Sequence, residues 1–257
     1  MTRYRKLNRM KTISAAFRLV LFVSSTLGLY WFWFFTHFFI PNKIHWRQVI
    51  FGAWTKSFVR ISRMNIEVIG TPPKPPFFLV TNHLSYADIG AIRAVAKGIF
   101  VAKSDIEGWF LAGRICRDMG TIFIDRGNRR DIPRAGEKII ERLDAGEGVV
   151  VFPEGTSTKG ETVLPFNSSF LEFAARTNIP VSYASISYRT PPGELPASLA
   201  ACWWEDISFF AHLWRLLKVR EYTATIYFGD APILNPDRKV LATELRDRIA
   251  DTFVPVL

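Results

Sequence analysis

The stretch Phe77-Phe78-Leu79-Val80-Thr81-Asn82-His83-Leu84-Ser85-Tyr86-Ala87-Asp88 decides the fold class of this chain. It starts with a short apolar run, which is typical of a buried strand. Asp88 follows at the expected start of a helix, where the helix dipole favours an acid. A buried strand that leads directly into a helix indicates an α/β protein.

The same alternation continues along the chain. The pattern predicts further strands at 99–102, 121–124, 149–152, 181–187 and 223–228, and helices at 88–97, 131–145 and 240–253. Strands that alternate with helices predict a sheet flanked by helices. The proline-rich segment 70–76 reads as a stiff linker and marks a domain boundary.

The basic charge is confined to the start of the chain. The 257 residues carry a net charge of +10. Residues 1–66 contain 11 Lys or Arg and no acid, whereas the remaining 22 Lys or Arg face 23 Asp or Glu. A basic segment of this kind suits either nucleic acid or an anionic membrane.

The apolar content of the same region favours the membrane. Residues 13–40 are nearly all apolar, and residues 19–36 carry no charge, which is close to the length needed to cross a bilayer. The aromatic run 30–35 suits a membrane interface. A cleavable signal peptide is the competing interpretation, but no small-residue cleavage site follows. We therefore expect membrane lipids as partners and no nucleic acid.

A second helix is predicted at 44–64, where apolar and basic positions alternate at helical spacing. This pattern is typical of a helix in a lipid headgroup layer, although an amphipathic core helix would look similar. Basic residues flank the apolar stretch on both sides, which favours a helical hairpin that dips into the membrane from the cytoplasmic face of the inner membrane. We expect residues 1–66 to be the anchor and residues 67–257 the catalytic domain. The two cysteines, Cys116 and Cys202, fit a reducing compartment.

His83 and Asp88 form the first group of residues that could carry chemistry. Histidine is the side chain best suited to accept a proton near neutral pH. Asp88 lies five residues later, within reach of a ring nitrogen, where it would fix the tautomer and stabilise an imidazolium. The alternative is that His83 merely follows a strand and Asp88 merely caps the helix.

Two further blocks follow predicted strands. The strand at 149–152 ends in Pro153-Glu154-Gly155-Thr156, at the position where α/β folds place their sites. Arg126 comes just after the strand at 121–124, and an arginine can bind a phosphate with two hydrogen bonds. Either block could equally be a plain turn or a solvated strand end.

Together the three blocks resemble the glycerolipid acyltransferase family, which includes the 1-acyl-glycerol-3-phosphate acyltransferases. The Asn-His-x4-Asp (HX4D) hallmark of that family is matched by Asn82, His83 and Asp88. Its second block is matched by residues 122–126, and its Phe-Pro-Glu-Gly-Thr block by residues 152–156. The resemblance covers about half of the chain and predicts the sheet fold of this family behind an N-terminal membrane-associated helical hairpin.

The resemblance implies an O-acyltransferase of phospholipid biosynthesis. The acyl donor would be the thioester of acyl-CoA or an acyl carrier protein, with no bound cofactor and no metal. The acceptor would be the hydroxyl of a lysolipid. His83 would act as general base and Asp88 would orient it, without a covalent acyl-enzyme. The residues implied to bind the acceptor are Arg126, Glu154, Gly155 and Thr156.

Departures from the family pattern bear on the acceptor. Ser157 stands where relatives commonly have arginine, and Asn167-Ser168-Ser169 replaces a stretch that is commonly basic. The resemblance points first to 1-acyl-glycerol-3-phosphate or a related lysophospholipid. The missing cations favour an acceptor with less charge than a phosphomonoester. A lyso-ornithine lipid is therefore the alternative.

Other classes of protein fit less well. A serine hydrolase needs a Gly-x-Ser-x-Gly elbow, and the nearest match, at 155–159, ends in lysine. The four histidines are too scattered for a metal enzyme, and there is no glycine-rich phosphate loop. A non-catalytic membrane protein that keeps these residues unused remains the alternative from another class.

Overall fold

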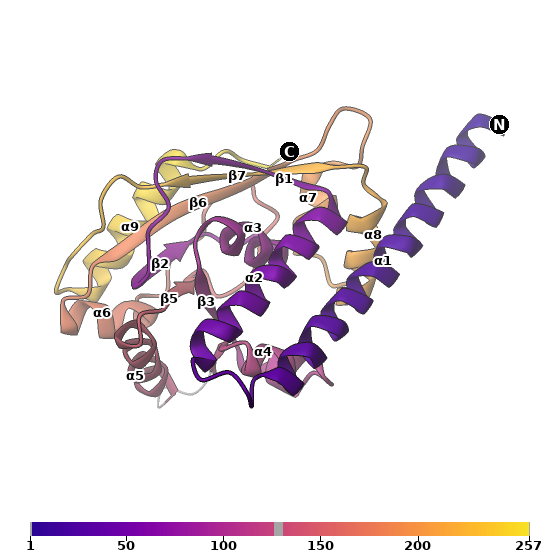
Figure 1. The fold of residues 1–257 in the computed structure, drawn as a ribbon. Coiled ribbons are helices and arrows are strands. Elements are labelled where there is room, and N and C mark those ends of the chain that lie inside the picture. The colour runs from indigo at the N-terminus through magenta and orange to yellow at the C-terminus, as the bar shows by residue number, and fades with distance from the viewer. Residues whose placement is uncertain (1, 126–130, 257) are drawn as a thin grey trace.

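A single mixed sheet forms the centre of the computed structural model, which describes residues 2–125 and 131–256 (Figure 1). The strand order is β1-β7-β6-β2-β5-β3-β4. The strands are β1 (Met64–Ile69), β2 (Phe77–Thr81), β3 (Gly98–Lys103), β4 (Ile122–Ile124), β5 (Gly148–Val151), β6 (Val181–Arg189) and β7 (Tyr222–Phe228). The α-helices are α1 (Thr2–Thr36), α2 (Lys43–Ser62), α3 (Ala87–Val95), α4 (Ala112–Asp118), α5 (Asp131–Asp144), α6 (Glu172–Thr177), α7 (Ala197–Ala200), α8 (Phe209–Lys218) and α9 (Arg238–Thr252), with 3-10 turns η1 (Ser104–Gly108) and η2 (Ser168–Leu171). The predicted α/β class is confirmed.

The direction of the strands sets one functional edge. β2 pairs in parallel with both β5 and β6, and β3 pairs in parallel with β5 and β4. The carboxyl ends of these five strands therefore lie at the same edge of the sheet. β7 runs antiparallel to β6, and β1 pairs with β7.

Helices cover both faces of the sheet because its central strands are apolar on both sides. Successive residues of β2 point to opposite faces, so Leu79 packs in one buried cluster and Phe78 in the other. Residues of α2, α3 and α8 complete the first cluster. Residues of α5, α6 and α9 complete the second. The structure is thus three layers, with α1 as an outlying helix (Figure 1).

The helix α1 packs against α2 and α8 but leaves most of its apolar surface exposed. From Arg9 to Thr36 it is long and apolar enough to cross a bilayer by length and composition, and only 11% of its most apolar window is buried. A core helix of a soluble protein would be mostly buried. Arg18, a polar interruption of this stretch, is 6% exposed and donates to the carbonyls of Leu217 and Val219 at the end of α8. These carbonyls lack partners within their helix, so the arginine satisfies them.

A buried ion pair joins α2 to the sheet. The guanidinium of Arg47 lies 2.5 Å from the carboxylate of Glu147, and the two residues are 7% and 3% exposed. Gln48 donates to the same carboxylate, and Arg142 lies 3.6 Å from it. Glu147 directly precedes β5, so this contact connects α2 to the strand that leads to the Pro-Glu-Gly-Thr block.

One boundary expected from the sequence is wrong. The proline-rich segment 70–76 was predicted to separate two domains, but the strands on either side of it, β1 and β2, belong to the same sheet. It is a stiff connection across that sheet. The pattern also missed β1, which is largely exposed and pairs with a strand far away in sequence.

Candidate active site

His83 lies just beyond the carboxyl end of β2, and Asp88 lies in the first turn of α3. Nδ1 of His83 is 2.8 Å from Oδ2 of Asp88. The same oxygen accepts hydrogen bonds from the backbone amides of Leu84 (2.8 Å) and Ser85 (3.0 Å). Because the short loop wraps its own amides around Asp88, the carboxylate is fixed in front of the ring.

A fourth donor completes the environment of Asp88. The hydroxyl of Tyr188, at the end of β6, donates to Oδ1 of Asp88 at 2.7 Å. Asp88 is fully buried and Tyr188 is 3% exposed. Burial and the neighbouring carboxylate hold the pKa of Tyr188 well above its usual range, so the hydroxyl remains a donor. The buried carboxylate of Asp88 is stable here because each of its hydrogen-bond partners donates to it.

The opposite side of the imidazole is accessible. The His83 side chain is 21% exposed, and none of the described residues hydrogen bonds to its Nε2. The ring stacks on Phe152, with centroids 4.1 Å apart and planes 23° from parallel. In the neutral imidazole, Nδ1 donates to Asp88, and Nε2 is then an acceptor that points away from the carboxylate. Such a nitrogen can remove a proton from a bound hydroxyl.

The block after β5 holds the backbone of His83. Oε1 of Glu154 accepts the backbone amide of His83 at 3.0 Å, and the amide of Thr158 donates to the His83 carbonyl at 3.1 Å. Burial raises the pKa of Glu154 to about 8, although the amides of His83 and Leu164 oppose that shift. The glutamate therefore holds the His83 backbone without adding a full negative charge near neutral pH.

The remaining predicted site residues are less enclosed. Gly155 follows Glu154 with a φ of +78°, a conformation that glycine adopts without strain. Thr156 is exposed at the same turn, and its hydroxyl donates to the Ser157 carbonyl at 3.3 Å. Arg126 lies outside the described residues. The strand before it, β4, ends at the same edge of the sheet as β2 and β5.

Further residues frame the site, and of these only Asn82 belongs to a block identified in the sequence. Asn82 replaces a ladder hydrogen bond, since its side chain exchanges two hydrogen bonds with the backbone of Ile186 (2.9 and 2.8 Å). Trp203 donates its amide to the Leu84 carbonyl at 2.8 Å. His212 contacts the Tyr86 hydroxyl at 3.0 Å and is fully buried, and burial lowers its pKa to about 4. Among Tyr188, Trp203 and His212, which were missed from the sequence, only Tyr188 had a usable signal, because it continues the inward-facing alternation of β6.

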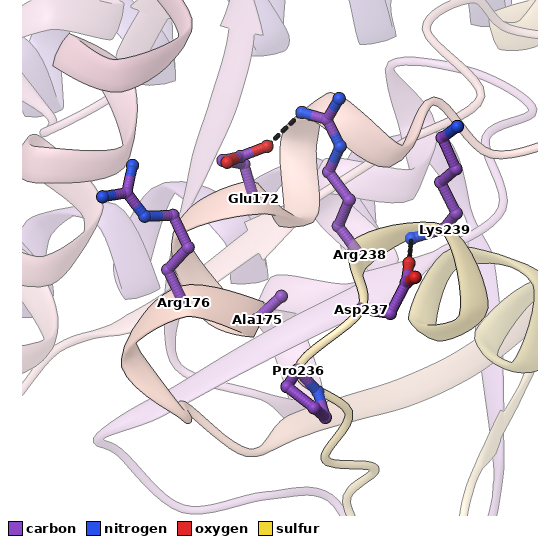
Figure 2. Close-up of a pocket in the computed structure, with 7 residues that line it drawn as sticks. All are labelled: Glu172, Ala175, Arg176, Pro236, Asp237, Arg238 and Lys239. Atoms are coloured by element: carbon purple, nitrogen blue, oxygen red, sulfur yellow. Dashed lines mark hydrogen bonds and ion pairs between the residues drawn. The ribbon is translucent and has the colours of Figure 1, made fainter.

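A groove of about 670 Å³ lies elsewhere, between α6 and the start of α9. Figure 2 shows two contacts among its charged residues: Arg238 pairs with Glu172, and the Asp237 carboxylate accepts the Lys239 backbone amide at 2.7 Å. The groove adjoins the amino end of β6, at the edge of the sheet opposite His83. It takes no part in the site.

Comparison with known proteins places this geometry in a family. A family model described as Acyltransferase matches residues 63–187. A lyso-ornithine lipid O-acyltransferase from Rhodobacter capsulatus is 31% identical over 205 residues, which cover 77% of this chain and 73% of that protein. The chain belongs to this acyltransferase family. The resemblance inferred from the three sequence blocks is confirmed.

Other relatives of this acyltransferase differ in their acceptor. A lyso-ornithine lipid O-acyltransferase from Pseudomonas aeruginosa is 29% identical, with 79% of this chain and 78% of that protein covered. A 1-acyl-sn-glycerol-3-phosphate acyltransferase from Neisseria gonorrhoeae is also 29% identical, with 64% of each chain covered. The crystal structure of the acyltransferase PlsC from Thermotoga maritima, at 21% identity, shares the fold with a TM-score of 0.69 over 98% of this chain and 95% of that one.

Proposed function

We propose that this acyltransferase esterifies the free hydroxyl of a membrane lysolipid with a fatty acyl group from acyl-CoA or acyl carrier protein. The observation that carries the proposal is the His83–Asp88 pair, 2.8 Å apart, with Nε2 of His83 directed away from the carboxylate. The helix α1 anchors the enzyme, and the sheet with its covering helices, α2 among them, carries out the reaction without a bound cofactor. Nucleic acid is not a partner.

The reaction needs a proton acceptor and no protein nucleophile. Nε2 of His83 takes the proton of the acceptor hydroxyl while the hydroxyl oxygen attacks the thioester carbonyl carbon. Asp88 stabilises the imidazolium that forms. The tetrahedral intermediate then expels the thiolate, the C–S bond breaks, and the imidazolium returns the proton to sulfur. The products are the ester and the free thiol.

The contacts around the acceptor side favour a head group of low charge. Ser157 donates its hydroxyl to the Trp203 carbonyl, and Asn167 uses its side chain to cap η2 at the Ser169 amide. Lys159 is paired with Glu161 at 2.6 Å. The positions where relatives carry cations thus serve local structure here. We infer that a lyso-ornithine lipid is the preferred acceptor and 1-acyl-glycerol-3-phosphate the second candidate, with Arg126, Gly155 and Thr156 contacting the head group.

Competition between two acceptors tests this inference. The full-length enzyme is given a labelled acyl thioester, which is acyl-CoA in one reaction and acyl carrier protein in another. Each reaction contains lyso-ornithine lipid and 1-acyl-glycerol-3-phosphate at equal concentration. We expect the ornithine product to dominate, and Asn167→Lys to shift the ratio toward phosphatidic acid by several-fold because one charged hydrogen bond contributes about 1.5–3 kcal/mol. Thr243→Lys adds the same charge at an exposed position of α9, outside the predicted site residues, and should leave the ratio unchanged. A wild-type preference for the phosphomonoester contradicts the charge argument, and transfer to neither acceptor contradicts the proposed function.

We also propose that the anchor does not cross the bilayer, so that the catalytic domain faces the cytoplasm. The support is the run of basic residues on both flanks of the apolar segment. Single cysteines replacing Arg9 and Lys97, in a chain with Cys116 and Cys202 changed to Ala, should both resist an impermeant thiol reagent in intact spheroplasts. Both should react once the membrane is permeabilised. Labelling of position 9 alone in intact spheroplasts would establish a true span.

A further inference from the structure

Exposed aromatic rings gather beside the candidate active site, on segments outside the N-terminal anchor. We call this set the aromatic rim. Phe110 is 98% exposed, Phe210 69%, Trp204 42% and Trp109 41%. Aromatic side chains of this size are normally buried in the core of a soluble domain. An exposed cluster of them therefore indicates a surface that meets another phase or partner.

The rim joins segments that are distant in sequence. The ring centroids of Trp109 and Phe209 are 6.0 Å apart, although one residue follows η1 and the other starts α8. Phe209 also contacts Trp203 at 6.1 Å, and the adjacent Phe210 at 5.4 Å. Segments about a hundred residues apart in sequence thus present their rings side by side.

The rim is attached to the loop that carries the candidate base. Phe209 packs edge-on against Tyr86, with centroids 4.8 Å apart, and Tyr86 lies between His83 and Asp88 in the sequence. Trp203 donates its amide to the Leu84 carbonyl, and its own carbonyl accepts the Ser157 hydroxyl. Any surface that contacts the rim therefore lies next to the loop that carries His83.

The rim is also continuous with α1. Leu213 and Leu217 of α8 form a buried cluster with Ala15, against which Phe209 and Phe22 pack. At the other end, the Tyr30 hydroxyl donates to Asp118 of α4 at 2.8 Å. Both segments that carry rim residues are thus held against the one described helix that is apolar enough for a bilayer, and Figure 1 shows α8 beside α1.

We propose that the aromatic rim is a second membrane contact, through which the catalytic domain itself inserts Trp109, Phe110 and Phe210 into the lipid interface beside the His83 site. Trp side chains concentrate at this depth of a bilayer, and Phe side chains bury their apolar rings at the same boundary. The contact lets an acceptor lipid enter from the membrane plane without first leaving the bilayer. The proposal rests on the proposed function only in taking a membrane lipid as the acceptor.

The direct test measures insertion without using activity. An environment-sensitive fluorophore is attached to the full-length chain at Phe110→Cys, with Cys116 and Cys202 replaced by Ala. The matched control carries it at Val240→Cys, which is 50% exposed on α9. On vesicles of equal parts phosphatidylcholine and phosphatidylglycerol, position 110 should shift to the blue and be quenched by brominated acyl chains, whereas position 240 should do neither.

Two results would overturn the proposal. One is a fluorophore at position 110 that stays as water-exposed on vesicles as the one at position 240. The other is a blue shift at position 110 that appears without lipid and grows with protein concentration, which would assign the rim to contact with a second copy of the chain.

A kinetic test separates this surface from the chemistry. Phe110→Asp/Phe210→Asp should raise KM for an acceptor embedded in vesicles by roughly ten-fold or more, since charged side chains are excluded from the interface that aromatic side chains favour. With a short-chain acceptor dissolved as monomers, kcat/KM should be unchanged. An equal loss on both acceptors contradicts the proposal, whereas absence of transfer by the wild type contradicts only the proposed function.

Discussion

We expect His83→Ala to lower kcat by a factor of roughly 10²–10⁴ while the protein remains folded. The reason is that the imidazole is the one described group that is both held by a buried carboxylate and open to a substrate at its other nitrogen. Turnover of a labelled acyl thioester by the full-length protein is the measurement. His45→Ala is the matched control, because His45 is an exposed residue of α2 and should retain full activity.

Asp88→Asn separates charge from geometry in the same assay. Three donors surround Oδ2 of Asp88, and the Tyr188 hydroxyl faces Oδ1. An asparagine can keep its oxygen toward the three N–H groups and turn its amide toward the tyrosine, so the loop should survive. The loss of activity then measures how far the negative charge stabilises the imidazolium. A folded His83→Ala protein with near-normal turnover would remove His83 from the mechanism.

Glu147→Ala should lower the free energy of unfolding by about 3–5 kcal/mol. The substitution leaves the buried guanidinium of Arg47 without its carboxylate, and it removes the acceptor that Gln48 and Arg142 share. An uncompensated charge in the interior costs more than the intact pair contributes. Chemical denaturation of the full-length protein in detergent is the measurement.

The control for this effect is an ion pair on the surface. Lys103 and Asp105 are paired with side chains 54% and 64% exposed, so Asp105→Ala should change stability little. Arg47→Met/Glu147→Met removes both charges and should recover much of the stability lost by Glu147→Ala. If Glu147→Ala behaves like Asp105→Ala, the pair does not hold α2 to the sheet.

Much of the fold was predictable because its central strands are short apolar runs with clear ends. β2, β5 and β6 were expected within one or two residues of their observed bounds, and so was α5. The pattern identified these elements because burial on both faces leaves few polar positions. The outer strand β1 was missed, since an exposed edge strand alternates weakly and its partner β7 lies more than 150 residues away.

The candidate site was also predictable in part. The sequence by itself determined that a histidine and an acid five residues apart follow a buried strand, and that Pro-Glu-Gly-Thr follows another. Parallel strands end at one edge, so these blocks were expected at the same edge of the sheet, and the pairing of β2 with β5 makes them neighbours. The sequence also determined the family, because the order and spacing of the three blocks are read directly along the chain.

Only the tertiary structure decided what surrounds these residues. Tyr188 meets Asp88 across 100 positions of sequence, and Glu154 meets the His83 amide across 71. The rings of the aromatic rim come together only when α8 packs beside η1. A local pattern reports the periodicity and burial of its own segment. A hydrogen bond between distant segments depends on strand order and helix packing, which the whole chain settles together.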